Sequence, residues 1–435
     1  MTADRVRCVI VADDLTGAAD SSAALAALGL RVVIVPWPHD DDVRAAVATA
    51  GGRAGIDVLV IETASRELDA VAAGRRLADV ATALRDVTDG VAAAQERTDE
   101  PWVVKKVDSV LRGPIAAEVG ALRVGIGATT TVVAPAFPRL GRTTVDGVQL
   151  VDGAPVGTSP TDRVRGRAAS VAEISRACGL PEAILRAPGE GPVEGAVTVH
   201  DARTDSDLER LARTLAAEHP RPFVVCTAGL LEHLAPHLAP HHRQGSPVSE
   251  FRPVSTGGPT LVISLSPTAA ASAQVDDLVG SREALRLDLA LDAALDDPES
   301  AGKALGGRLA AALDDGPSAL VLLGLAGEER TPRDTEVSAV RAAALRAVDA
   351  ALTVVSRPPQ VLANGGDSAR LVVDRWYPSS LAVVGPLPHG GALTRSEDGA
   401  LLAMKSGGFG PATALSDIVD VLTARSVHVE GAHSS

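Results

Sequence analysis

Aromatic side chains are scarce in this sequence of 435 residues, which holds four phenylalanines, three tryptophans and one tyrosine. Binding of single-stranded nucleic acid without sequence preference depends on aromatic rings that stack with the bases. The formal net charge of −14 also argues against the broad basic face that nucleic acids require. A small anionic ligand remains compatible with this charge, because screening limits charge interactions to about 8 Å at physiological salt. We therefore expect a small-molecule ligand and no nucleic-acid partner.

Long apolar runs are also missing, and none approaches the roughly 20 residues that a membrane-spanning helix needs. The N-terminal run Val6–Ala12 ends at Asp13 and Asp14, too early for a signal-peptide core. The three cysteines are far apart and odd in number, a pattern typical of reduced thiols in the cytoplasm. The sequence thus predicts a cytoplasmic protein with no membrane partner. It leaves the oligomeric state open, with a homodimer among the alternatives.

Lysine is the scarcest charged residue, and only Lys105, Lys106, Lys303 and Lys405 occur. Two of these stand in Lys105–Gly113 (KKVDSVLRG), between the apolar run 102–104 and a helix-like segment at 115–122. Ligands of α/β proteins bind at the carboxyl ends of strands, where helix N-termini attract anions. This turn therefore predicts an anion site. The alternative is a solvated strand end in which Asp108 pairs with Arg112.

Short β-branched runs alternate with alanine-rich helical stretches along most of the chain. Strand, turn and helix units begin near residues 6, 57, 102 and 129, and they resume near residue 260. Such alternation predicts an α/β fold with mostly parallel sheets, and the length suits two domains. Prolines, histidines, serines and glycines interrupt the pattern once. We therefore place an N-terminal domain at 1–240, a linker at 241–259 and a C-terminal domain at 260–435.

Two glycine-rich turns follow expected strands in the second half, at Asn364–Ala369 (NGGDSA) and Lys405–Gly410 (KSGGFG). Glycines in such turns let backbone N–H groups approach a phosphate, and a lysine adds positive charge. Each could be a plain tight turn, but two in one domain favour phosphate binding. Neither a GxxxxGK[ST] loop nor a strand-linked GxGxxG is present, so the common NTPase and dinucleotide fingerprints are excluded.

Seven motifs spread over almost the whole chain are shared with one known family. They are Ala12–Asp20 (ADDLTGAAD), Glu62–Arg66 (ETASR), Lys105–Gly113, Ala134–Arg142 (APAFPRLGR), Gly365–Ala369 (GGDSA), Gly385–Pro388 (GPLP) and Lys405–Gly410. Together they resemble the four-carbon acid sugar kinases, which phosphorylate threonate, erythronate or 2-oxo-tetronate with ATP. The resemblance implies an N-terminal acid-sugar binding domain, a C-terminal nucleotide-binding domain and an active site in the interdomain cleft.

Three segments depart from the family pattern. The family usually has an acidic residue or Asp-Thr before its Ser-Arg pair, where this chain has Glu62–Ala64. The segment 158–167 fits only loosely. Ile263 stands where glycine usually precedes Ser264, and the path from Ser264 to Gln274 is longer than usual.

A sugar-acid kinase needs an anchor for the carboxylate, a proton acceptor and a phosphate site. We expect Arg66 and Arg112 to grip the carboxylate bidentately, and Asp14 to act as general base. The other acid-site candidates are Asp13, Lys105, Lys106, Asp108, Ser109 and Gly113, of which Lys105 and Asp108 are also candidate catalytic residues. The candidates for binding ATP are Ser264, Ser266, Asn364, Gly365, Gly366, Asp367, Ser368, Lys405, Ser406, Gly407 and Gly408. Asp367 is also the expected Mg²⁺ ligand, through water.

Two other functions fit parts of the sequence. A sugar-acid dehydrogenase or aldolase would use the acid site alone, although the missing dinucleotide fingerprint argues against a dehydrogenase. A non-catalytic sugar-acid binding or regulatory protein would keep the acid site without ATP turnover, an alternative raised by the departure at Ile263. Assays of ATP consumption and of NAD(P) absorbance separate these functions.

Overall fold

The computed structural model describes residues 6–38, 42–52, 55–92, 100–156, 183–238, 257–316, 320–326, 334–358 and 360–423. Residues 241–256 of the expected linker and the loosely matching segment 158–167 lie outside these ranges. Within the ranges described, no helix combines the length and the apolarity needed to cross a membrane.

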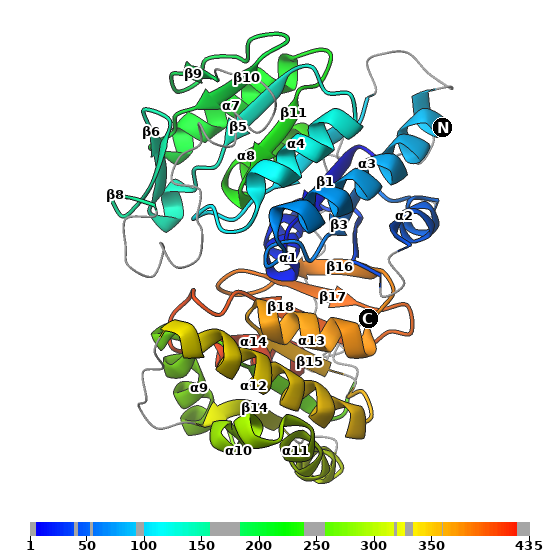
Figure 1. Ribbon diagram of the computed structural model, residues 1–435, viewed down its shortest axis with the longest axis vertical. Helices are drawn as coiled ribbons and strands as arrows, with labels where there is room; N and C mark the ends of the chain where they lie inside the picture. Colours follow the sequence, from blue (N-terminus) through cyan, green and yellow to red (C-terminus); the bar gives the residue numbers. More distant parts are fainter. Residues whose placement is uncertain are drawn as a thin grey trace, which may run out of the picture. The chain divides into compact units, whose positions relative to one another are not determined.

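The chain divides into two compact units, each with helices and strands of its own (Figure 1). The first unit comprises Met1–Gln244 and Tyr377–Val383, and the second comprises Gly245–Trp376 and Val384–Ser435. The predicted fold class of two α/β domains with mostly parallel sheets is confirmed. Tyr377–Val383 belongs to the first unit although it lies within the range expected for the C-terminal domain.

The first unit is built on a parallel sheet with strand order β2-β3-β1-β4-β11-β5-β10-β9. Its elements are β1 (Cys8–Ala12), α1 (Leu15–Ala27), β2 (Val32–Val35), α2 (Val43–Gly51), β3 (Val58–Glu62), α3 (Ala70–Ala92), β4 (Trp102–Lys106), α4 (Ile115–Gly125), β5 (Thr131–Ala134), β6 (Arg142–Val145), β7 (Val148–Val151), β8 (Ala154–Pro155), β9 (Ile184–Arg186), β10 (Val197–His200), α7 (Asp205–Ala217), β11 (Phe223–Cys226) and α8 (Ala228–Leu238). Strands β6, β7 and β8 form a separate antiparallel sheet. The start of β16 (Leu381–Pro386) pairs antiparallel with β2.

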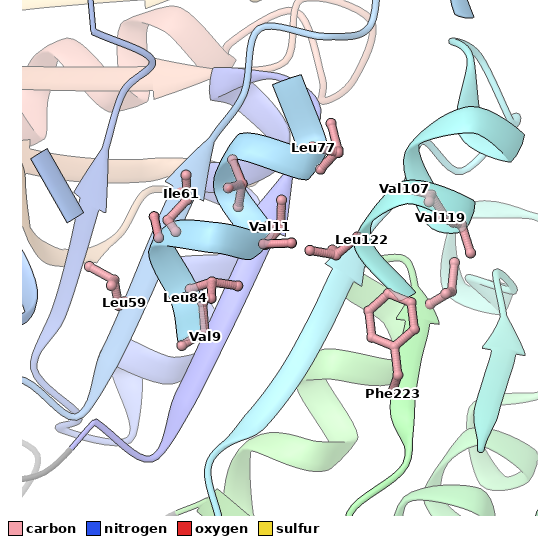
Figure 2. Packing of buried hydrophobic residues seen from close by; sticks show 14 of the residues in the cluster. Val9, Val11, Leu59, Ile61, Leu77, Leu84, Val107, Val119, Leu122 and Phe223 are labelled. Carbon is pink, nitrogen blue, oxygen red and sulfur yellow. The ribbon is translucent and has the colours of Figure 1, made fainter. Parts of the chain in front are cut away.

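The central strands β1, β3 and β11 are buried along their whole length, as expected for a parallel sheet covered by helices. All five residues of β1 are buried. Figure 2 shows Val9 and Val11 of β1 in one apolar cluster with Leu77 and Leu84 of α3 and Leu122 of α4. This core holds the strands whose ends carry the polar turns.

The register of the central strands brings three motifs together. Ala12, the last residue of β1, lies opposite Glu62 of β3 and Lys106 of β4. Because the strands are parallel, the turns that follow them meet at one edge of the sheet. These turns belong to the motifs 12–20, 62–66 and 105–113.

The second unit contains a sheet with strand order β13-β14-β12-β15-β18-β17, parallel except for β17. Its elements are β12 (Thr260–Ser264), α9 (Ala269–Ser281), β13 (Leu285–Ala290), α10 (Leu291–Asp296), α11 (Pro298–Leu313), β14 (Leu320–Ala326), α12 (Asp334–Val354), β15 (Gln360–Asn364), α13 (Gly366–Trp376), β17 (Ala392–Arg395), β18 (Leu401–Lys405) and α14 (Ala414–Thr423). Ser264, Asn364 and Lys405 lie at the same level on three neighbouring strands. The two glycine-rich turns therefore start side by side.

Candidate functional site

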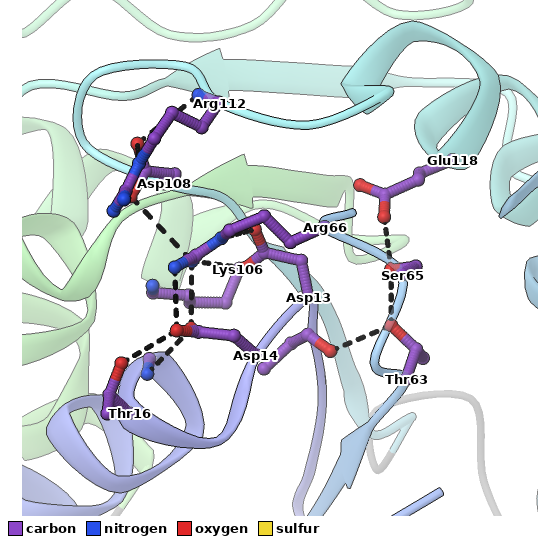
Figure 3. A network of polar contacts seen from close by, with 12 residues as sticks. Asp13, Asp14, Thr16, Thr63, Ser65, Arg66, Lys106, Asp108, Arg112 and Glu118 are labelled. Carbon is purple, nitrogen blue, oxygen red and sulfur yellow. Dashed lines mark hydrogen bonds and ion pairs between the residues drawn. The ribbon is translucent and has the colours of Figure 1, made fainter. Parts of the chain in front are cut away.

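Arg66 joins two carboxylates at the end of β1 (Figure 3). Its Nε and Nη2 donate to Asp13 at 2.7 and 3.0 Å, and its Nη1 and Nη2 donate to Asp14 at 2.6 and 2.8 Å. A guanidinium has five N–H donors, and these contacts use four of them. In the structure the hydrogen-bond partners of Arg66 are therefore two aspartates, whereas the sequence suggested a substrate carboxylate as its partner.

Asp14 is the N-cap of α1. Its carboxylate accepts from the backbone N–H of Gly17 at 2.8 Å and from the Thr16 hydroxyl at 2.6 Å, in addition to the two bonds from Arg66. A carboxylate offers about four lone-pair sites, so these bonds occupy them. Asp14 could accept a proton from a substrate only by giving up one of these donors.

Asp13 and Asp108 are buried carboxylates that cations keep ionised. Burial alone would raise the pKa of Asp13, but the charges of Arg66, Lys106 and Lys105 outweigh it and lower the pKa to about 2. Burial would likewise raise the pKa of Asp108, and the charge of Arg66 with the bonds from Arg112 holds it far below its usual range. Both groups can therefore accept hydrogen bonds at neutral pH.

Arg112 pairs with Asp108, as the alternative interpretation of this turn predicted. Its Nε and Nη2 donate to the Asp108 carboxylate at 2.9 and 2.6 Å. The Arg112 side chain is 38% exposed, against 7% for Asp108. One edge of the guanidinium is therefore committed to Asp108 and the rest faces outward.

The two adjacent lysines differ in their partners, since successive residues of a strand point to opposite faces. Lys105 is fully buried, and its Nζ lies 3.2 Å from a carboxylate oxygen of Glu118. Glu118 also accepts from Ser65, which is hydrogen-bonded to Thr63 at 2.7 Å. Lys105 therefore belongs to a buried network that supports the turn after β3.

Lys106 lies on the other face of β4, against the first turn of α1. A Cβ on Gly17 would lie 2.2 Å from the Lys106 Nζ, so only glycine leaves room for the ammonium. Lys106 is 7% exposed. Among the residues that the structure describes, its ammonium has no hydrogen-bond or ion-pair partner. Lys106 is thus the cation of this cluster that remains available to a ligand.

The turn that carries Arg66 has supports that the sequence did not reveal. Ala64 has a φ of 46°, in the left-handed region that favours glycine. Arg76 of α3 donates to the carbonyls of Thr63 and Ala64 at 2.9 and 3.3 Å. Its guanidinium also lies 4.3 Å from the ring centroid of Trp37. Arg76 stands in no motif, so only the fold identifies this contact.

Two further acid-site candidates have structural contacts. The carbonyl of Ser109 accepts from the buried Gln149 side chain at 3.0 Å, which fixes this turn to β7. Gly113 has a φ of 91°, and a Cβ there would lie 3.3 Å from the Arg66 carbonyl. Gly113 thus permits the close approach of two turns.

All expected nucleotide-binding residues lie in three adjoining turns of the second unit. The N–H of Gly365 donates to the carbonyl of Lys405 at 2.7 Å, and Thr268 donates to the carbonyl of Gly407 at 3.0 Å. A Cβ on Gly407 would lie 2.6 Å from the side chain of Ser266. These contacts hold the turns 264–268, 364–368 and 405–410 together.

Asn364 places an unpartnered acceptor at these turns. Its Nδ2 donates to the Ser264 hydroxyl at 3.0 Å, and the side chain is fully buried. Its Oδ1 has no hydrogen-bond partner among the described residues. A buried carbonyl oxygen without a donor is costly, so this position favours a polar ligand or water.

Lys405 points into its own turn. It is 1% exposed, and its Nζ donates to the carbonyls of Ser406 and Phe409 at 2.7 and 2.5 Å and to the side chain of Gln274 at 3.2 Å. An ammonium has three N–H donors, and this cage uses all of them. Lys405 stabilises the turn from within, and Gln274 reaches it despite the unusual spacing from Ser264.

Asp367, the expected Mg²⁺ ligand, is paired with Arg341 of α12. Arg341 donates from Nη2 and Nε to the two carboxylate oxygens at 2.5 and 2.8 Å. The described residues contain no group of three or more histidine, cysteine, aspartate or glutamate side chains able to hold a metal. A single carboxylate fits Mg²⁺ only where phosphates and water supply the other ligands, and here Arg341 would first have to release it.

Comparisons with known proteins find a separate family model for each half of the chain. A family model described as a sugar-binding N-terminal domain matches residues 8–234, and one described as a nucleotide-binding C-terminal domain matches residues 261–415. The chain is 31% identical to the D-threonate kinase of Bordetella bronchiseptica, over 92% of this chain and 94% of that protein. It is 28% identical to the 3-oxo-tetronate kinase of Methylobacterium radiotolerans, over 95% and 98%.

Two further similarities are more limited. The match with the D-threonate kinase of Salmonella typhimurium has 28% identity and covers 66% of this chain and 64% of that protein. A crystal structure of a Haemophilus influenzae protein superposes with a TM-score of 0.62 at 19% identity, over 95% of this chain and all of that one. This structural match supports the fold alone.

Proposed function

The chain belongs to the four-carbon acid sugar kinase family, and we propose that it transfers the γ-phosphoryl group of ATP to a hydroxyl of a four-carbon sugar acid. Threonate, erythronate and their oxo derivatives are the substrate class. The observation that carries the proposal is the Lys106 ammonium, which lies near ionised carboxylates but makes no hydrogen bond or ion pair with any residue that the structure describes. A small hydroxy acid supplies both a carboxylate for this cation and hydroxyls for the neighbouring acceptors.

The pairing of the other cations favours Lys106 as the main anchor for the substrate carboxylate. Arg66 is already shared by Asp13 and Asp14, and Lys105 is paired with Glu118. The outward edge of Arg112 can donate to the same carboxylate. This assignment keeps Arg112 as a substrate contact and moves the principal role from Arg66 to Lys106.

In the second unit, backbone N–H groups of the turns 364–368 and 405–410 would bind the phosphates. α13 begins at Gly366, and the first N–H groups of a helix have no partner within the helix and attract anions. Bound Mg²⁺ would neutralise the triphosphate charge. Asp367 would meet the metal through water, and Arg341 would then have to take another partner.

The transfer forms a bond between the substrate oxygen and the γ-phosphorus and breaks the bond from that phosphorus to the β,γ-bridging oxygen, which leaves with ADP. The hydroxyl proton passes to a carboxylate of the acid site, and Asp14 is the proposed acceptor. Release of one of its four donors would leave a lone pair for this proton. The reaction requires the acid of the first unit and the triphosphate of the second to meet during turnover.

A coupled assay of ADP release tests the proposal. The full-length protein is incubated with Mg·ATP and, separately, D- and L-threonate, D- and L-erythronate and their 2-oxo and 3-oxo relatives. We expect ADP formation with at least one acid, and a phosphate ester in the ³¹P spectrum of the product. Acid binding in calorimetry without any ADP formation would instead favour a non-catalytic binding protein, and NAD(P) reduction would favour a dehydrogenase.

A further inference from the structure

Arg341 is an arginine outside every motif, yet it is held at the start of α13. Its guanidinium grips Asp367, the second residue of that helix, through two hydrogen bonds. The side chains of Arg341 and Asp367 are 43% and 35% exposed. Exposed ion pairs of this kind are weak. A more highly charged anion at the same place could therefore take the arginine from Asp367.

A cation at this place would suit the nucleotide proposed as the ligand of the second unit. A nucleotide polyphosphate carries several negative charges, and the lysine expected to meet them is enclosed by three oxygen acceptors of its own turn. The turn before α13 also contains the unpartnered buried oxygen of Asn364, which indicates a ligand independently of the helix end. A planar guanidinium suits phosphate oxygens because it donates two parallel hydrogen bonds.

We propose that Arg341 is the side chain that binds the nucleotide phosphates, and that Asp367 holds it at the start of α13 until the nucleotide replaces the carboxylate. The inference rests on the proposed function, since it concerns the same nucleotide site. The proposal also changes the roles that the sequence suggested for Asp367 and Lys405. Asp367 is the resting partner of Arg341 in addition to its expected role toward Mg²⁺, and Lys405 supports the turn.

The test measures binding of ADP to the full-length protein by calorimetry in EDTA, so that no metal contributes. Arg341→Gln should weaken ADP binding roughly ten- to hundredfold, as expected for the loss of a charge-assisted contact. Asp367→Asn should tighten it by up to about fivefold, because the competing carboxylate is gone. Arg346→Gln is the matched control, since Arg346 is an exposed arginine of the same helix, and it should leave binding within about twofold of wild type.

The decisive comparison is between Asp367→Asn and the double variant Arg341→Gln/Asp367→Asn. If Arg341 touches the phosphates, the double variant should bind ADP at least about tenfold more weakly than Asp367→Asn. Equal affinities would mean that Arg341 only shields Asp367, and they would overturn the inference. An ADP affinity reduced as much in Arg346→Gln as in Arg341→Gln would also overturn the inference. Thermal denaturation of each variant identifies any loss of fold. Wild-type protein that binds Mg·ATP but no ADP in EDTA would overturn the inference, because Arg341 would then not hold the phosphates without the metal. Failure to bind either nucleotide would refute the proposed function itself.

Discussion

Replacement of Gly17 by alanine should weaken acid binding with little change in stability. The added Cβ would lie 2.2 Å from the Lys106 Nζ and 2.5 Å from the Asp14 Oδ1. Ordinary contacts between non-bonded heavy atoms are 3.5–4.0 Å, so the ammonium must move by about 1 Å. The Lys106 side chain is flexible and can move, but it then leaves the place from which it would meet a carboxylate.

The expected change in stability is much smaller than the expected change in acid binding, so the two can be measured separately. Alanine is more favourable than glycine in a helix by about 1 kcal/mol, whereas disturbance of the Asp14 N-cap costs about 0.5–2 kcal/mol. The free energy of unfolding should therefore change by no more than about 1 kcal/mol. A displaced charge-assisted contact is worth roughly 1.5–3 kcal/mol, which raises the KM for the acid roughly ten- to hundredfold.

Initial rates at saturating ATP, with the acid varied, measure this effect, and urea denaturation measures stability. Gly74→Ala is the control, because Gly74 also lies within a helix of the first unit and a Cβ there would have its nearest neighbours at 4.0 Å. It should leave both KM values unchanged and raise stability by up to about 1 kcal/mol. A wild-type KM for the acid in Gly17→Ala would refute the role given to Lys106.

Two more predictions concern the same cluster. Arg76→Met should raise the KM for the acid about three- to tenfold and leave the KM for ATP unchanged. The reason is that loss of a hydrogen bond with a net worth of about 1 kcal/mol loosens the turn that carries Arg66. The same substitution at the exposed neighbour Arg75 is the control and should change neither KM. Asp13, with its pKa lowered from 3.8 to about 2, contributes about 2 kcal/mol of stability above pH 4 that disappears as the pH falls towards 2. Urea titrations from pH 6 to 2 measure this loss, and an equally steep loss in Asp13→Asn would contradict its assignment to Asp13.

The sequence predicted that the residues of the first three motifs lie close together, because these motifs stand at strand ends. Parallel pairing then brings the turns after β1, β3 and β4 together without further information. The individual partners could not be predicted in this way. The pairing of Arg66 with two aspartates and the cage around Lys405 depend on hydrogen-bond geometry between turns far apart in the chain. Local residue types do not encode that geometry.

Residues outside the motifs were missed for a different reason. Arg76, Gln149 and Arg341 act through contacts with carbonyls or carboxylates that lie 12 or more positions away. In the sequence they are ordinary polar residues of a helix or strand. Tyr377–Val383 likewise joins the first unit, because Leu381 and Ala382 pair with β2. The local sequence does not predict this pairing.

The small number of lysines makes the two proposed ligand sites separately observable. Reductive methylation with ¹³C-formaldehyde would label at most four side chains and the N-terminal amine, so each dimethylamine resonance could be assigned by single substitutions. Lys303 is exposed beside Glu299 and serves as an internal reference. Addition of a sugar acid should shift the Lys106 resonance, and the enclosed Lys405 should resist the reagent unless its turn opens.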